Sequence, residues 1–141
     1  MSHTTYSEQE THALAHTFLK QLTGGEVIEL VGDLGSGKTA FVRGLAEALG
    51  AKARVKSPTF TVMNEYPVEG HPSIERIVHI DLYRFKDPSQ ISALEFNDYK
   101  NDETIICIEW PNIFNESVID STHVIKFKFI DENTREIVIE S

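Results

Sequence analysis

The chain has 141 residues, a length typical of one domain, and its 40% hydrophobic and 25% charged residues argue against disorder. Its 13 Lys and Arg against 22 Asp and Glu give a net charge of −9, which argues against a free-standing nucleic-acid binder because phosphate contacts need a basic face. The single cysteine excludes an intramolecular disulfide, and no apolar run approaches the roughly 18 residues of a membrane span. We therefore expect one cytoplasmic domain over residues 1–141, with no membrane partner.

In the N-terminal half, helical and strand patterns alternate. Ser7 and Glu10 have the spacing of a capping box, so a helix is expected to begin there and to end at the glycine pair 24–25. The run over 27–31 is short, apolar and rich in β-branched residues, which favours a buried strand. A glycine-rich stretch follows, and a second helix is expected over 40–49.

The C-terminal half is dominated by strand patterns. Strands are expected over residues 59–66, 76–83, 104–108, 124–129 and 136–140. The first two and the last two are each separated by turn residues, which favours hairpins. Alternation in the fourth strand puts Ile125, Phe127 and Phe129 on its apolar face, and Asp87-Pro88 predicts the start of a short helix over 89–96.

The glycine-rich stretch reads GDLGSGKT and fits the P-loop pattern G-x-x-x-x-G-K-[ST]. Glycines 32, 35 and 37 permit the backbone angles and the close approach that a phosphate cradle requires. Lys38 supplies a charge to the β- and γ-phosphates, and Thr39 offers a hydroxyl to Mg²⁺. The motif follows a predicted strand and opens a predicted helix, so we expect an α/β fold with a P-loop NTPase-like mixed sheet, flanking helices and a C-terminal β-hairpin.

Two acids end apolar runs, as the metal-positioning acids of such enzymes do. Asp81 ends the run beginning at Ile77, and Glu109 ends the run beginning at Ile105. Either acid could hold magnesium while the other aligns water. His79 shares a strand face with Asp81 and is either a support for the site or a packed histidine.

A second loop segment could sense the γ-phosphate. Thr59 lies between the P-loop helix and the next predicted strand, where a switch would lie, although an ordinary turn explains the segment equally well. The guanine signature N-K-x-D does not occur, which favours adenine as the base.

Four motifs together resemble one family. The strings GDLGSGKT, KSPTF, HIDLYRF and IEWP begin at Gly32, Lys56, His79 and Ile108, and they resemble the TsaE family, the small bacterial P-loop ATPases of tRNA threonylcarbamoyladenosine synthesis. The resemblance covers nearly the whole chain. It implies an ATPase that works with the transferase TsaD and its partner TsaB to modify tRNAs that read codons beginning with A.

The resemblance also implies roles for individual residues. Thr39 and Glu109 would hold Mg²⁺, Asp81 would be the Walker B-like acid, and Trp110 would support function. Catalysis would rest on Lys38, Asp81 and Glu109. The implied ATP contacts of the loop are Gly32, Gly35, Ser36, Gly37, Lys38, Thr39 and Ala40. Glu8 and Arg135 fall where the family contacts the nucleotide away from the phosphates, although a helix-start charge and a hairpin charge are equal alternatives.

Two rival functions stay open at this point. The chain contains only five arginines, so we expect hydrolysis to be slow without a partner, and its acidity implies that partners hold the tRNA. A small ATP-dependent phosphotransferase is one rival, and it would form ADP only with an acceptor. A non-catalytic, nucleotide-gated binding module is the other, and it would bind ATP without releasing phosphate.

Overall fold

The computed structural model describes residues 1–33, 35–52, 55, 63–81, 99–110 and 121–140. Its helices are α1 (Glu8–Phe18), the 3₁₀ turn η1 (Leu19–Gln21) and α2 (Lys38–Ala48). Its strands are β1 (Ser2–Thr5), β2 (Val27–Val31), β3 (Met63–Pro67), β4 (Arg76–Asp81), β5 (Thr104–Trp110), β6 (His123–Phe129) and β7 (Arg135–Glu140).

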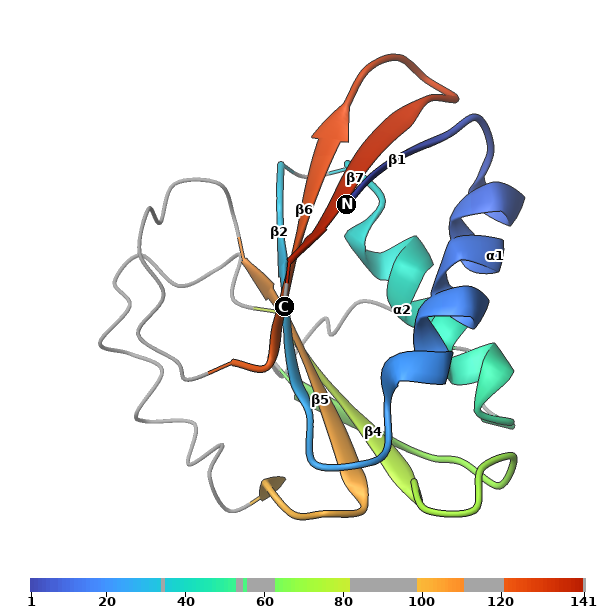
Figure 1. Ribbon diagram of the computed structural model, residues 1–141, viewed down its shortest axis with the longest axis vertical. Coiled ribbons are helices and arrows are strands. Elements are labelled where there is room, and N and C mark those ends of the chain that lie inside the picture. The colour runs from blue at the N-terminus through green and yellow to red at the C-terminus, as the bar shows by residue number, and fades with distance from the viewer. Residues whose placement is uncertain (34, 53–54, 56–62, 82–98, 111–120, 141) are drawn as a thin grey trace.

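The strands form one mixed sheet in the order β1-β7-β6-β2-β5-β4-β3. Strand β2 is parallel to both of its neighbours, β5 and β6, and β4 is parallel to β5. The pairs β3–β4, β6–β7 and β1–β7 are antiparallel. Both helices lie against the same face of the sheet (Figure 1). The predicted α/β fold with a mixed sheet and a C-terminal hairpin is confirmed.

The main core lies between the helices and the sheet. Helix α1 supplies Ala15 and Phe18, which pack with Phe41 of α2 and with the inner face of the strands. The opposite face has a smaller apolar cluster that includes Val78 and Ile106. In the described part of the chain, no helix is both long and apolar enough to cross a membrane.

On one face of β4 and β5, the side chains change from apolar in the core to polar at the carboxyl ends of the strands. Residues 77, 79 and 81 of β4 share the helix-facing side of the sheet, and so do residues 105, 107 and 109 of β5. Along each strand this side changes from isoleucine to a carboxylate at the carboxyl end. The two acids therefore lie at the same edge of the sheet as the P-loop.

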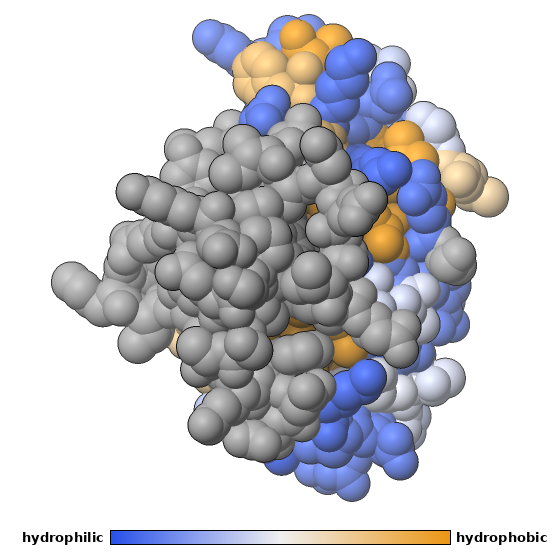
Figure 2. All heavy atoms as spheres, turned by 90° about the vertical axis from the view of Figure 1, so that its left-hand side faces the viewer, coloured by the Kyte–Doolittle hydropathy of each residue, from blue (hydrophilic) through white to orange (hydrophobic). Residues whose placement is uncertain are grey.

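Three details differ from the sequence predictions. Strand β1 was not predicted, because its four polar residues form a strand only through pairing with β7. The first helix ends at Phe18 and continues only as η1, since Leu22 is extended and the Glu26 carboxylate binds the next two N–H groups. Phe129, on the predicted apolar face of its strand, is 49% exposed. Figure 2 shows that hydrophobic side chains also reach the surface at the top of the molecule. The helix predicted over 89–96 lies outside the described residues.

Candidate functional site

The P-loop connects β2 to α2 and packs tightly against β6. A side chain at Gly32 would place its Cβ 2.7 Å from the Phe127 carbonyl oxygen, so only glycine fits there. Gly37 is the N-cap of α2 and has a φ of 105°, a left-handed conformation that other residues avoid. These two positions hold the loop under the first turn of α2.

The N-terminus of α2 is prepared for an anion, whereas that of α1 is not. No side chain caps α2, and no acidic residue lies in its first turn. In contrast, α1 begins with a Ser7 cap that accepts the Glu10 N–H at 3.1 Å, and its first turn contains two glutamates. The N-terminus of α2 therefore has uncapped N–H groups and a positive dipole end, and both favour binding of a negatively charged ligand.

Lys38 is the first residue of α2, and its side chain is buried against the P-loop. Its Nζ donates to the carbonyl oxygens of Gly32 and of Asp33, the latter at 3.0 Å. Burial lowers the pKa of Lys38, while the charges of Glu109, Asp81 and Asp33 act in the opposite direction. The ammonium is thus hydrogen-bonded to the P-loop and interacts electrostatically with the two acids at the sheet edge.

Glu109 is the centre of a buried polar group. The Thr39 hydroxyl lies 3.1 Å from Oε1 and 3.0 Å from Oε2 of Glu109, and His79 Nε2 hydrogen-bonds to Oε2 from the other side. Glu109 is 4% exposed and His79 is fully buried. Asp81 lies directly opposite Glu109 in the β4–β5 register. The helix and two strands therefore bring a hydroxyl and two carboxylates to one place.

The donors at this place suit Mg²⁺. Among the described residues, no group of three or more His, Cys, Asp and Glu side chains could hold a metal ion. Magnesium does not require such a group, since in nucleotide enzymes it takes one or two carboxylates and completes its shell with phosphates and water. The hydroxyl of Thr39 and the carboxylate of Glu109 are hard oxygen donors of this kind.

A cavity of about 420 Å³ lies beside the P-loop, and residues near both ends of the sequence also line it. Its lining residues are Ser7, Glu8, Thr11, Gly35, Ser36, Gly37, Lys38, Thr39, Ala40, Asp81, Glu109, Glu132, Asn133 and Arg135. All described residues expected at the site line this cavity except Gly32, which packs against Phe127 of β6. Thr59 and the side chain of Trp110 lie outside the described residues, so their roles stay predictions.

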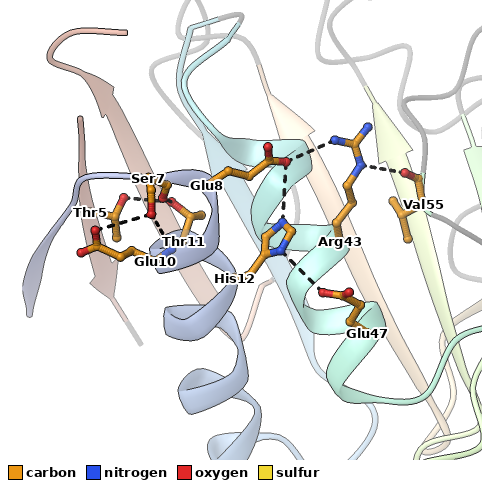
Figure 3. Close-up of polar contacts among 9 residues, drawn as sticks. All are labelled: Thr5, Ser7, Glu8, Glu10, Thr11, His12, Arg43, Glu47 and Val55. Atoms are coloured by element: carbon orange, nitrogen blue, oxygen red, sulfur yellow. Dashed lines mark hydrogen bonds and ion pairs between the residues drawn. The ribbon is translucent and has the colours of Figure 1, made fainter. Parts of the chain in front are cut away.

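Glu8 lies on the cavity wall and also joins the two helices (Figure 3). Its Oε1 is 3.5 Å from Arg43 Nη1 and 3.7 Å from His12 Nε2. Arg43 in turn donates through Nε to the Val55 carbonyl oxygen at 2.8 Å, and His12 lies 3.5 Å from Glu47. Glu8 therefore has a structural role that the sequence did not indicate, in addition to the predicted contact with the nucleotide.

Arg135 is the first residue of β7 and also lines the cavity. Its Nη1 donates to the carbonyl oxygens of Asp131 at 2.5 Å and Thr134 at 3.0 Å, and its guanidinium lies 4.6 Å from the centre of the Phe129 ring. Its buried Nε has no hydrogen-bond partner among the described residues. This anchored arginine holds the turn of the C-terminal hairpin beside the loop.

Sequence reasoning missed four residues of the cavity wall. Ser7 and Thr11 gave only helix signals, and Glu132 and Asn133 gave only a turn signal. Nothing in their local patterns indicates a ligand, because these segments meet only when β1 pairs with β7. The hydrogen bond between His79 and Glu109 had one weak signal in the sequence, because His79 lies two residues before Asp81 and so shares its strand face.

Comparison with known proteins decides the family. The model of the family described as "Threonylcarbamoyl adenosine biosynthesis protein TsaE" matches residues 5–137. The chain belongs to the TsaE family. It is 37% identical over 135 residues to the tRNA threonylcarbamoyladenosine biosynthesis protein TsaE of Aquifex aeolicus, covering 94% of this chain and 90% of that protein. The TsaE of Bacillus subtilis is 34% identical over 133 residues, with coverage of 94% and 80%.

A solved structure supports the same assignment. The crystal structure of YdiB from Bacillus subtilis superposes with a TM-score of 0.70 at 28% identity, covering 97% of this chain and 82% of that one. The likeness confirms the P-loop NTPase-like fold. Together with the TsaE relatives, it supports a nucleotide-binding protein with a role in tRNA threonylcarbamoyladenosine biosynthesis.

Proposed function

We propose that this TsaE-family chain binds and hydrolyses ATP with Mg²⁺, as one domain, during threonylcarbamoyladenosine modification of tRNAs that read codons beginning with A. The observation that carries the proposal is the meeting of Thr39 and Glu109, at 3.0 and 3.1 Å, beside the P-loop in the cavity. Family membership supplies the pathway, and the side chains support the chemistry.

Each group of the site has a task in this proposal. The N–H groups of the loop and of the first turn of α2 bind phosphate oxygens, and Lys38 neutralises charge on the β- and γ-phosphates. Thr39 and Glu109 hold the metal ion, which supplies charge neutralisation on the phosphates when it is bound. Asp81, opposite Glu109 in the register, is assigned to orient the attacking water. Glu8 and Arg135, which both line the cavity, bind the nucleoside part.

We propose further that hydrolysis is completed with partner proteins, the TsaB-TsaD transferase complex. The described part of the cavity lining contains two cationic side chains, Lys38 and Arg135, and Arg135 is engaged by the hairpin turn. An additional cation would stabilise charge in the transition state, as arginine fingers do in related enzymes, with rate gains of about 10³ or more. The tRNA is then held by the partners.

The test is phosphate release from ATP by the purified chain, alone and with the transferase pair. Slow release alone and faster release with the pair are expected. Lys38→Ala should abolish release and weaken nucleotide binding about 10- to 100-fold, because it removes a charged hydrogen-bond donor to phosphate. ADP that forms only with a phosphorylated acceptor would favour a phosphotransferase. Tight ATP binding without phosphate release beside the pair would favour a binding module.

A further inference from the structure

We propose that His79 is a positioning residue that orients the Glu109 carboxylate toward the metal ion; this inference rests on the proposed function. The imidazole lies on the same face of β4 as Asp81, two residues earlier, and across from Cys107 in the β5 register. It is fully buried beneath the polar edge of the sheet. His79 is therefore below the site and does not line the cavity.

The hydrogen bond fixes which nitrogen carries the proton. An ionised carboxylate only accepts hydrogen bonds, so His79 donates through Nε2–H to Glu109 Oε2. The other nitrogen, Nδ1, is buried and has no hydrogen-bond partner among the described residues. The role of the ring thus rests on one atom, Nε2, and on one partner.

The His79 donor restrains the Glu109 carboxylate, which is buried and has little access to water. Glu109 is 4% exposed, and its two oxygens lie between the Thr39 hydroxyl on one side and the imidazole on the other. Burial of a charged group is costly unless hydrogen bonds compensate it. With the Nε2–H donor in place, the carboxylate is held facing the hydroxyl of Thr39. Outer partners of this kind typically contribute 10- to 100-fold to metal affinity.

Two amide variants separate this role from packing. The amide nitrogen of glutamine reaches the position of Nε2, whereas that of asparagine reaches only the position of Nδ1. Both side chains are polar and similar in size, so the burial of an amide is common to both variants. Cys107→Ala is the matched control, because Cys107 is buried on the same face opposite His79 and is not one of the proposed metal ligands.

The readout is the factor by which Mg²⁺ tightens binding of a non-hydrolysable ATP analogue, measured by calorimetry in saturating Mg²⁺ and in EDTA. His79→Asn should reduce this factor about tenfold or more, with binding in EDTA unchanged. His79→Gln and Cys107→Ala should stay within about threefold of the wild type, whatever their thermal stability. Equal factors for the Asn and Gln variants would overturn the proposal. A wild-type factor of one would overturn the proposed function as well.

A spectroscopic measurement on the unaltered protein does not depend on how the variants fold. Nitrogen NMR of the His79 ring should show Nε2 protonated and Nδ1 unprotonated, both alone and with Mg²⁺ and the analogue. A proton on Nδ1 in the Mg²⁺-bound protein would also overturn the proposal.

Discussion

At the scale of single residues, the site depends on side chains that are far apart in sequence. Thr39 lies in the first turn of α2, and Glu109 lies near the end of β5, seventy positions later, yet the hydroxyl lies within 3.1 Å of both carboxylate oxygens. The buried imidazole of His79 completes the same group. Removal of the hydrogen-bonding or ligating atom at any of these positions is therefore expected to alter the metal requirement.

Thr39→Ala tests this expectation most directly. Loss of the hydroxyl removes one oxygen donor, so the Mg²⁺ concentration at half-maximal phosphate release should rise about tenfold or more, in line with roughly 1.5–3 kcal/mol for a charge-assisted contact. Thr39→Ser is the control, since it keeps the oxygen, and it should stay close to the wild type. An unchanged Mg²⁺ requirement in the alanine variant would contradict the assignment of Thr39.

At the scale of elements, the two helices differ at their N-termini: a side chain caps α1, and none caps α2. Ser7 caps α1 through the Glu10 N–H. Ser7→Ala should therefore lower the free energy of unfolding by about 1 kcal/mol, measured by denaturant unfolding. Ser7→Asp retains an acceptor and should restore most of the loss. Equal stability of the wild type and the alanine variant would show that the cap contributes little.

The turn of the C-terminal hairpin gives a prediction about pH. The Asp131 carboxylate accepts the N–H groups of Asn133 and Thr134, each at 2.9 Å, and these bonds lower the pKa of Asp131 below its ordinary value of 3.8. The ionised form then favours the folded turn. Its stabilising contribution is present above about pH 4 and is lost as the pH falls through the lowered pKa. A carboxyl carbon NMR titration should give a midpoint below 3.8, and a midpoint above it would contradict the turn geometry.

The elements that the sequence predicted well are those with strong local signals. The Ser7 cap, the strand over 27–31 and the C-terminal hairpin all have local patterns that the structure follows. Strand β1 and the link from Glu8 through Arg43 to Val55 have no local signal, because each is created by tertiary pairing. The P-loop and the two acids were visible as motifs, but the cavity walls at Thr11 and Asn133 depend on register.

At the scale of the whole molecule, net charge limits the partners. A chain with a net charge of −9 repels the phosphate backbone of RNA. The isolated chain is therefore expected not to bind tRNA at physiological salt in a fluorescence anisotropy titration. The transferase pair provides the positive control in the same titration. Tight, salt-sensitive binding by the isolated chain would contradict an indirect role toward tRNA.

The pairing of β1 with β7 has a consequence for the lifetime of the folded state. Thr5 pairs with Arg135, so the segment that leads to Glu8 and the strand that holds Arg135 meet across almost the full sequence. Because closing so long a loop costs conformational entropy, we expect these contacts to form after the folding transition state. A ligand that contacts both Glu8 and Arg135 would stabilise such late contacts. Nucleotide should therefore slow unfolding and leave the folding rate nearly unchanged, so that its presence determines how long the molecule survives rather than how quickly it forms.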